Sequence, residues 1–172
     1  MSVSIFTIGL SNHNIQKFVE ILKLHQINLV VDVRPNAFKT QLNQIDHPNL
    51  KEVLAEFEIS CVYRGEDLIV HNHDPNGCDD FSFMKIDHTS QMNAYQFTLN
   101  WLIKQASIQN TAIIYNEEYP NNFRNIRLIG RALTEQNIIL RHIQGSSNVE
   151  TELTVPLGSD GTENTLLNDS KS

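Results

Sequence analysis

Charged side chains follow three apolar runs of this chain at the points where the runs end. The run INLVVDVR ends with Asp32 and Arg34, and the run ISCVY is followed by Arg64 and Glu66. The run TAIIY is followed, after one Asn, by Glu117. A guanidinium group binds carboxylates and phosphates, and a carboxylate near an arginine can be tuned for proton transfer. These residues predict either a polar site for a small ligand or a network of structural ion pairs.

Segments with strand and helix patterns alternate before residue 144, and they would position these side chains. Short apolar or β-branched runs indicate strands at residues 3–9, 27–34, 59–63, 111–115 and 138–142. Helical spacing indicates helices at residues 15–24, 48–57, 92–106 and 121–136, the first capped by Asn12 or Asn14. This order predicts an α/β fold, a three-layer α/β/α arrangement with a mostly parallel sheet of about five strands. In such sheets ligands bind at the carboxyl ends of the strands, where these charged side chains would lie.

Two further groups of residues are expected at the same edge. Ser11 follows the first strand in the sequence GLSN, and Arg124 stands near the start of the last helix. Arg127 and Arg131 follow at i+3 and i+7, on one stripe of that helix. Because a helix start offers free N–H groups to anions, the stripe predicts a contact to a phosphate or a carboxylate. The alternative is that these arginines are solvated and pair with acids of neighbouring elements.

Metal-ligand side chains are frequent between residues 71 and 88, but they lack the spacing of a metal site. The segment holds His71, His73, Asp74, Cys78, Asp79, Asp80 and His88, without Cys-x-x-Cys or His-x-x-x-His. It therefore predicts a polar loop and no metal. The chain also lacks a G-x-G-x-x-G motif, a phosphate-binding G-K-[ST] loop and a G-x-S-x-G nucleophile motif, so no cofactor is expected.

Much of the formal charge of −7 lies in residues 144–172. This segment has five acidic residues, one basic residue and no aromatic residue, which predicts a disordered acidic tail after one folded domain of residues 1–143. The balance of 13 basic against 20 acidic residues argues against binding to long nucleic acids. Because no apolar run approaches the roughly 20 residues of a membrane helix and no signal peptide is recognised, we expect a cytoplasmic protein without membrane contact.

Four stretches of the chain also form a familiar pattern. They are Thr7-Ile8-Gly9-x-Ser11-Asn12, Val31-Asp32-Val33-Arg34, Gly65-Glu66-Asp67-Leu68 and Arg141-His142-Ile143. This pattern resembles domain-of-unknown-function family 488 (DUF488), over residues 5–143 of the chain. The resemblance implies the same α/β fold, and it marks Ser11, Asp32, Arg34, Glu66 and Glu117 as positions of the family's site.

One motif of that family is altered in this chain. DUF488 proteins typically carry Cys-x-Glu-x-x-Pro-x-x-Cys-His-Arg after their fourth strand. The equivalent residues here keep Glu117 and Pro120, whereas Tyr115, Phe123 and Arg124 replace the two cysteines and the histidine. A thiolate can act as a nucleophile or a metal ligand, and neither Tyr nor Phe replaces it. The resemblance therefore implies a catalytically degenerate member of the family.

Three functions remain open from the sequence. The first is binding of a small, anionic ligand in a polar pocket lined by Ser11, Asp32, Arg34, Arg64, Glu66, Glu117 and Arg124. The second is an enzyme that uses Glu66 and Glu117 for acid–base chemistry without a covalent nucleophile. The third is a protein-interaction module that contacts its partner through the acidic tail.

Overall fold

One sheet with the strand order β3-β2-β4-β1-β5-β6 lies at the centre of the molecule. The computed structural model describes residues 3–10, 14–34, 45–68, 88–116, 124–143 and 149–151, without the side chains of 88–91, 124–128 and 149–151. The strands are β1 (Ser4–Gly9), β2 (Leu29–Asp32), β3 (Ser60–Tyr63), β4 (Thr111–Tyr115), β5 (Ile139–Ile143) and β6 (Val149–Thr151). The helices are α1 (Ile15–Leu24), α2 (His47–Ala55), α3 (Gly65–Leu68), α4 (His88–Ile108) and α5 (Arg124–Glu135).

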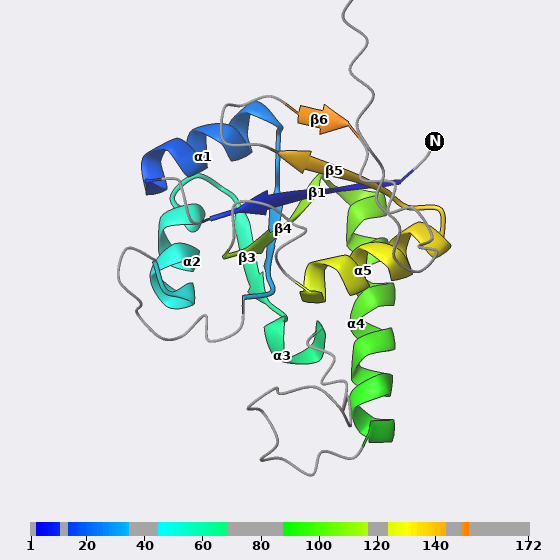
Figure 1. The fold of residues 1–172 in the computed structure, drawn as a ribbon. Helices are drawn as coiled ribbons and strands as arrows, with labels where there is room; N and C mark the ends of the chain where they lie inside the picture. The colour runs from blue at the N-terminus through cyan, green and yellow to red at the C-terminus, as the bar shows by residue number, and fades with distance from the viewer. Residues whose placement is uncertain are drawn as a thin grey trace, which may run out of the picture.

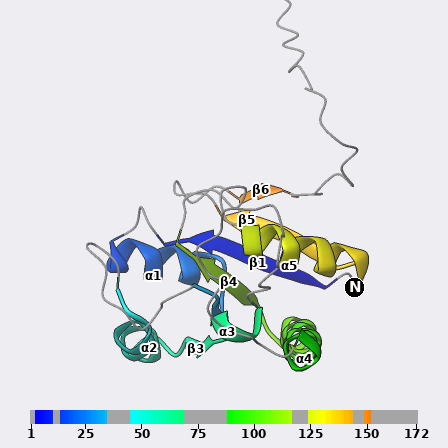
Figure 2. The ribbon, with the colours of Figure 1, turned by 60° about the horizontal axis from the view of Figure 1, so that its bottom comes forward.

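Strands β1 to β5 run parallel, and β6 pairs antiparallel with β5 (Figure 1). Helices α1 and α2 cover one face of the sheet, and α4 and α5 cover the other (Figure 2). The predicted α/β fold with three layers and a mostly parallel sheet is therefore confirmed.

Alternating side chains along the strands supply two separate cores, one under each helical layer. In β1, Ile5 packs into the core below α4 and α5, whereas Phe6 and Ile8 pack into the core below α1 and α2. Helix α4 contributes Leu99 and Leu102 to the first core, and both side chains are fully buried. This two-sided burial explains why the strands read as almost continuous apolar runs.

Helices begin with side-chain caps at the carboxyl edge of the sheet and end in left-handed turns at the amino edge. At the carboxyl edge, Asn14 caps α1 by accepting a hydrogen bond from Lys17 N at 2.8 Å, as expected for one of the two candidate caps. Asp46 caps α2 in the same way, through Asn49 N at 3.0 Å. At the amino edge, α1, α2 and α5 end in turns at the left-handed residues Gln26, Glu58 and Asn137, with φ between 54° and 60°.

Two aromatic residues of the segments predicted as helices are exposed. Helix α2 ends at Ala55, so Phe57 lies beyond it, 39% exposed, with Lys23 Nζ 4.0 Å from the centre of its ring. Phe97 is 72% exposed, because the buried face of α4 is formed by residues such as Tyr95, Leu99 and Leu102. Apolar character alone therefore does not define which side of a helix faces the core.

The sheet also extends past residue 143, where the sequence places the start of the tail. Residues 149–151 form β6, and Val149 and Thr151 pair with Ile143 and Arg141 of β5. A strand this short carries too little alternation to stand out in a polar segment. Residues 152–172 and the His- and Asp-rich loop of residues 71–87 lie outside the described residues. Within the described parts, no helix has the length and apolar character needed to cross a membrane.

Candidate functional site

The helical connections change sides of the sheet at β4. Helices α1 and α2 follow β1 and β2 and lie on one face, whereas α5 follows β4 and lies on the other. Strand β4 lies between β2 and β1, so its carboxyl end is the point where the connections diverge. In open α/β sheets ligands bind at such switch points, outside the carboxyl ends of the strands. Two clusters of buried polar side chains lie on the two faces next to this point.

The first cluster, called here the Asp32 cluster, consists of Asp32, Arg34 and His47 on the α1/α2 face. Arg34 Nε donates to Asp32 Oδ1 at 2.9 Å, and Arg34 Nη2 donates to Oδ2 at 2.8 Å. His47 Nδ1 lies 3.0 Å from the same Oδ2. The third guanidinium nitrogen, Nη1, donates to the carbonyl of Ile45 at 2.7 Å. Since Asp32 and Arg34 are 0% and 2% exposed, this is a fully desolvated ion pair that ties the end of β2 to the start of α2.

Electrostatics in the Asp32 cluster favour the ionised carboxylate. Burial alone would raise the pKa of Asp32, but the hydrogen bonds from Arg34 and His47 and the charge of Arg34 outweigh burial and lower the pKa. The thiol of Cys61 on neighbouring β3 responds in the opposite way. Burial and the Asp32 charge raise the pKa of Cys61 to about 12, so this thiol stays protonated at neutral pH.

Tyr63 closes one side of the Asp32 cluster. Its ring centre lies 5.6 Å from that of His47. The ring also leans over Gly65, where an added Cβ would lie 2.6 Å from the Tyr63 hydroxyl oxygen, so a larger residue there would have to displace the ring. Burial, followed by the negative charges of Glu66 and Asp32, raises the pKa of Tyr63. The tyrosine therefore stays neutral and packs its ring against His47 and Gly65.

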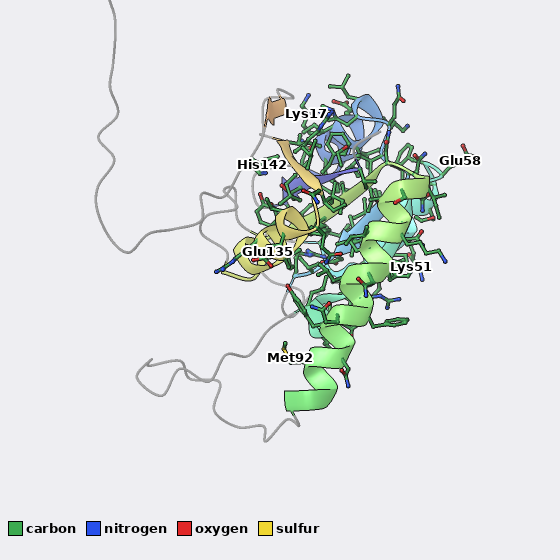
Figure 3. All side chains as sticks on the ribbon, turned by 90° about the vertical axis from the view of Figure 1, so that its right-hand side faces the viewer. Lys17, Lys51, Glu58, Met92, Glu135 and His142 are labelled. Carbon is green, nitrogen blue, oxygen red and sulfur yellow. The ribbon has the colours of Figure 1, made fainter. Side chains whose placement is uncertain are left out.

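The second cluster, called here the His142 cluster, consists of Thr7, Tyr115 and His142 on the α4/α5 face. These residues come from the three adjacent strands β1, β4 and β5. His142 Nδ1 lies 3.1 Å from Thr7 Oγ1 and 3.0 Å from the Tyr115 hydroxyl oxygen, and the two rings stack with centres 6.1 Å apart. All three side chains are buried. The position of His142 on β5 is labelled in Figure 3.

Asn116 follows β4 directly at the switch point. Its Oδ1 is buried and has no hydrogen-bond partner among the described residues. The backbone just before it is held by hydrogen bonds from the residues that follow β1 and β2, because Leu10 N donates to Tyr115 O and Val33 N donates to Ile114 O. A buried acceptor at the ordered end of a strand favours a ligand that donates a hydrogen bond to it.

Of the predicted site residues, the structure brings Asp32 and Arg34 together and places Arg64 elsewhere. The Arg64 backbone N–H donates to the carbonyl of Asp32 at 2.9 Å, which continues the β2–β3 ladder. Its guanidinium carbon lies 4.9 Å from the centre of the Trp101 ring, towards α4 and away from the Asp32 cluster. Glu66 lies in α3 and is exposed to solvent.

The remaining predicted residues are described in part or not at all. Ser11 and Glu117 lie outside the described residues, and Arg124 begins α5 but its side chain is not among those described. Arg131 is exposed, as the alternative of solvated arginines expects, but its Nε donates at 3.1 Å to Glu135 of the same helix and not to an acid of a neighbouring element.

The sequence analysis did not select His47, Tyr63, Thr7, Tyr115 or His142 as site residues. For His47 a signal exists, because Asp46 and Pro48 mark a helix start, and helices that follow parallel strands begin at the carboxyl edge. For His142 the signal is its place near the end of the fifth predicted strand. Thr7 gives no comparable signal, since a threonine inside a strand is common.

The described residues contain no metal site, and the chain has no match among known proteins. Among the residues that the structure describes, no group of three or more His, Cys, Asp or Glu side chains could hold a metal ion. Comparisons with protein-family models, with curated proteins and with solved structures found no match. The resemblance to DUF488 therefore stays a prediction made from its motifs.

Proposed function

We propose that this chain binds a small anionic ligand that also carries a hydroxyl or amine donor, at the carboxyl end of β4. The observation that carries the proposal is the buried Oδ1 of Asn116 at the switch point, without a partner among the described residues. A buried acceptor that stays unpaired costs about 1–3 kcal/mol, and a donor on the ligand would remove that cost.

The anionic character is inferred from α5, which follows β4. Its first turn begins at Arg124 and carries Arg127, and helix starts attract negative charge through their free N–H groups. Because α1 and α2 start at the same edge, the positive ends of all three helix dipoles are directed towards it. Hydroxylated phosphates such as nucleotides and sugar phosphates combine both required groups.

The proposal includes no covalent chemistry, as the resemblance to a degenerate family member implies. Tyr115 occupies the position of the first family cysteine, and its hydroxyl is buried against His142. Cys61 is the free cysteine of the described part, and its raised pKa removes it as a nucleophile. A buried reduced thiol also agrees with a cytoplasmic location, which we include in the proposal.

Thermal denaturation in the presence of AMP, ribose 5-phosphate or inorganic phosphate tests the proposal. Binding at 100 times the Kd stabilises the native state by about 2.7 kcal/mol, which corresponds to a rise in Tm of roughly 5–10 °C. We expect at least one of the two hydroxylated phosphates to raise the Tm more than inorganic phosphate does.

A pair of Asn→Ala variants locates the effect. Asn116→Ala at the carboxyl end of β4 should reduce the ligand-dependent rise in Tm, whereas Asn110→Ala, just before the amino end of β4, should keep it. No rise with any of the three compounds would contradict the proposal. So would a rise that Asn110→Ala abolishes and Asn116→Ala retains.

A further inference from the structure

Helices α1, α2 and α5 are followed by the same type of turn at the amino edge of the sheet. In each turn the N–H of an isoleucine donates to the carbonyl of a leucine five residues earlier, at 2.9 or 3.0 Å. The N–H of the left-handed residue just before the isoleucine donates to a carbonyl three residues earlier, at distances between 2.9 and 3.1 Å. This pair of bonds defines the Schellman motif. The three equivalent turns are His25-Gln26-Ile27, Phe57-Glu58-Ile59 and Gln136-Asn137-Ile138.

The first residue of the turn distinguishes the α1 turn from the other two. Phe57 and Gln136 have no titratable group, and both side chains are exposed. His25 is partly buried, and its ring lies against that of Phe6 on β1, with centres 5.8 Å apart. The Nε2 atom of His25 is buried and has no hydrogen-bond partner among the described residues. The α1 turn therefore holds one imidazole nitrogen away from water.

The charged groups of the neighbouring elements do not compensate for this burial. Lys23 of the same helix directs its Nζ to the ring of Phe57. Arg141 of β5 lies opposite Phe6 in the strand register and is exposed. Strand β1 and the short turn between α4 and β4 contain no charged residue. Burial lowers the pKa of His25, and no charged group of the described part of the chain contributes to this shift.

Protonation of His25 would conflict with the closed turn. The imidazolium carries an N–H at both ring nitrogens, so Nε2 would have to reach water. That movement takes the ring away from Phe6 and displaces the turn. The Gln26 carbonyl in this turn accepts a hydrogen bond from Asn110 Nδ2 at 3.1 Å, and Asn28 N donates to Asn110 O at 2.9 Å. Opening of the α1 turn therefore also loosens its connection to the start of β4.

We propose that protonation of His25 in mild acid opens the turn between α1 and β2, so that the amino edge of the sheet contains a pH-sensitive switch. The equivalent turns after α2 and α5 stay closed, because neither has a buried titratable group at the first position. This proposal is independent of the ligand proposed above, since it concerns the opposite edge of the sheet.

Amide hydrogen exchange of the full chain, measured by NMR from about pH 8 to about pH 5, tests the switch. The amide of Ile27 reports on the α1 turn, and the amides of Ile59 and Ile138 report on the two equivalent turns. A histidine whose pKa is lowered in the closed turn stabilises that turn fully above the ordinary pKa of about 6.5. The stabilisation is lost as the pH falls from there through the lowered pKa.

The expected result follows from the single proton that the open turn binds more readily. After correction for the intrinsic exchange rate, the protection of Ile27 should fall by up to about tenfold per pH unit below about pH 6.5. The protection of Ile59 and Ile138 should stay constant over the same range. Constant protection of Ile27 would overturn the proposal, and so would an equal loss in all three turns.

Two substitutions exchange residues between equivalent turns. His25→Gln introduces the residue that the α5 turn has at this position, and the protection of Ile27 should then no longer depend on pH. Gln136→His is the matched control, because it places a histidine at an exposed position of the same motif. Ile138 should keep its protection in acid, since that ring is hydrated in the closed turn. A pH dependence that His25→Gln retains, or that Gln136→His transfers to Ile138, would overturn the proposal.

Discussion

Two buried polar clusters lie at the same edge of the sheet but are held together by different kinds of interaction. The Asp32 cluster contains a full ion pair, and each oxygen of the carboxylate accepts two hydrogen bonds. The His142 cluster contains two hydroxyl groups that contact one imidazole nitrogen. The charged cluster is therefore a rigid tie between β2 and α2, in which the charges satisfy each other. The His142 cluster is held by contacts between hydroxyl groups and an imidazole, and the loss of one hydroxyl removes no charged group.

The largest expected effect comes from removing the charge of Asp32. Asp32→Asn keeps the shape but leaves the buried guanidinium of Arg34 without its counter-ion, so we expect a loss of about 3–5 kcal/mol in the free energy of unfolding. Urea denaturation measures this loss. Asp46→Asn is the matched control, because Asn caps a helix about as well as Asp and the loss should be small. Similar losses in the two variants would mean that the ion pair has no special structural role.

The second effect is a pH dependence that we expect from the Asp32 cluster. The pKa of Asp32 is lowered in the folded protein, so its contribution is fully present above the ordinary aspartate pKa of about 3.9. The contribution is lost as the pH falls through the lower folded-state pKa. The stability difference between the native chain and Asp32→Asn should therefore shrink below about pH 4. A difference that stays constant into acid would contradict the lowered pKa.

The smallest effect concerns the hydroxyl groups of the His142 cluster. Tyr115→Phe and Thr7→Val should each reduce the free energy of unfolding by about 1 kcal/mol. Because both hydroxyls contact the same nitrogen, the double variant should lose about 0.5 kcal/mol less than the sum of the two losses. A double-mutant cycle in urea gives this coupling energy. Strict additivity would show that the two contacts are independent, and the description of one shared cluster would then be wrong.

The fold could be predicted from the sequence because the central strands β1, β2 and β4 are buried on both faces. Runs such as VSIFTIG and TAIIY leave few other structures that remove so much apolar surface from water. The short elements α3 and β6 were missed, since four and three residues carry no measurable periodicity.

The site could be predicted in part, for reasons that the two clusters make clear. Asp32 and Arg34 were found because two charges at the end of an apolar run conflict with burial unless they are paired. The same reasoning also selected Arg64, whose side chain lies against Trp101 towards α4. Thr7 and Tyr115 fit a buried strand without conflict, so nothing in the sequence separates them from packing residues. Both residues contact His142 because β4, β1 and β5 are neighbours in the sheet, and the order of strands in a sheet cannot be derived from residue spacing along the chain.

The most direct test of the central claim is an NMR titration of the ¹⁵N-labelled chain with AMP and ribose 5-phosphate. The account predicts that shifted amide signals concentrate at the carboxyl edge, around Leu10 and Asn116. The turns at Gln26, Glu58 and Asn137 on the amino edge provide an internal control, and their signals should stay in place. No saturable shift with either compound, or shifts centred on the amino-edge turns, would contradict ligand binding at the carboxyl end of β4.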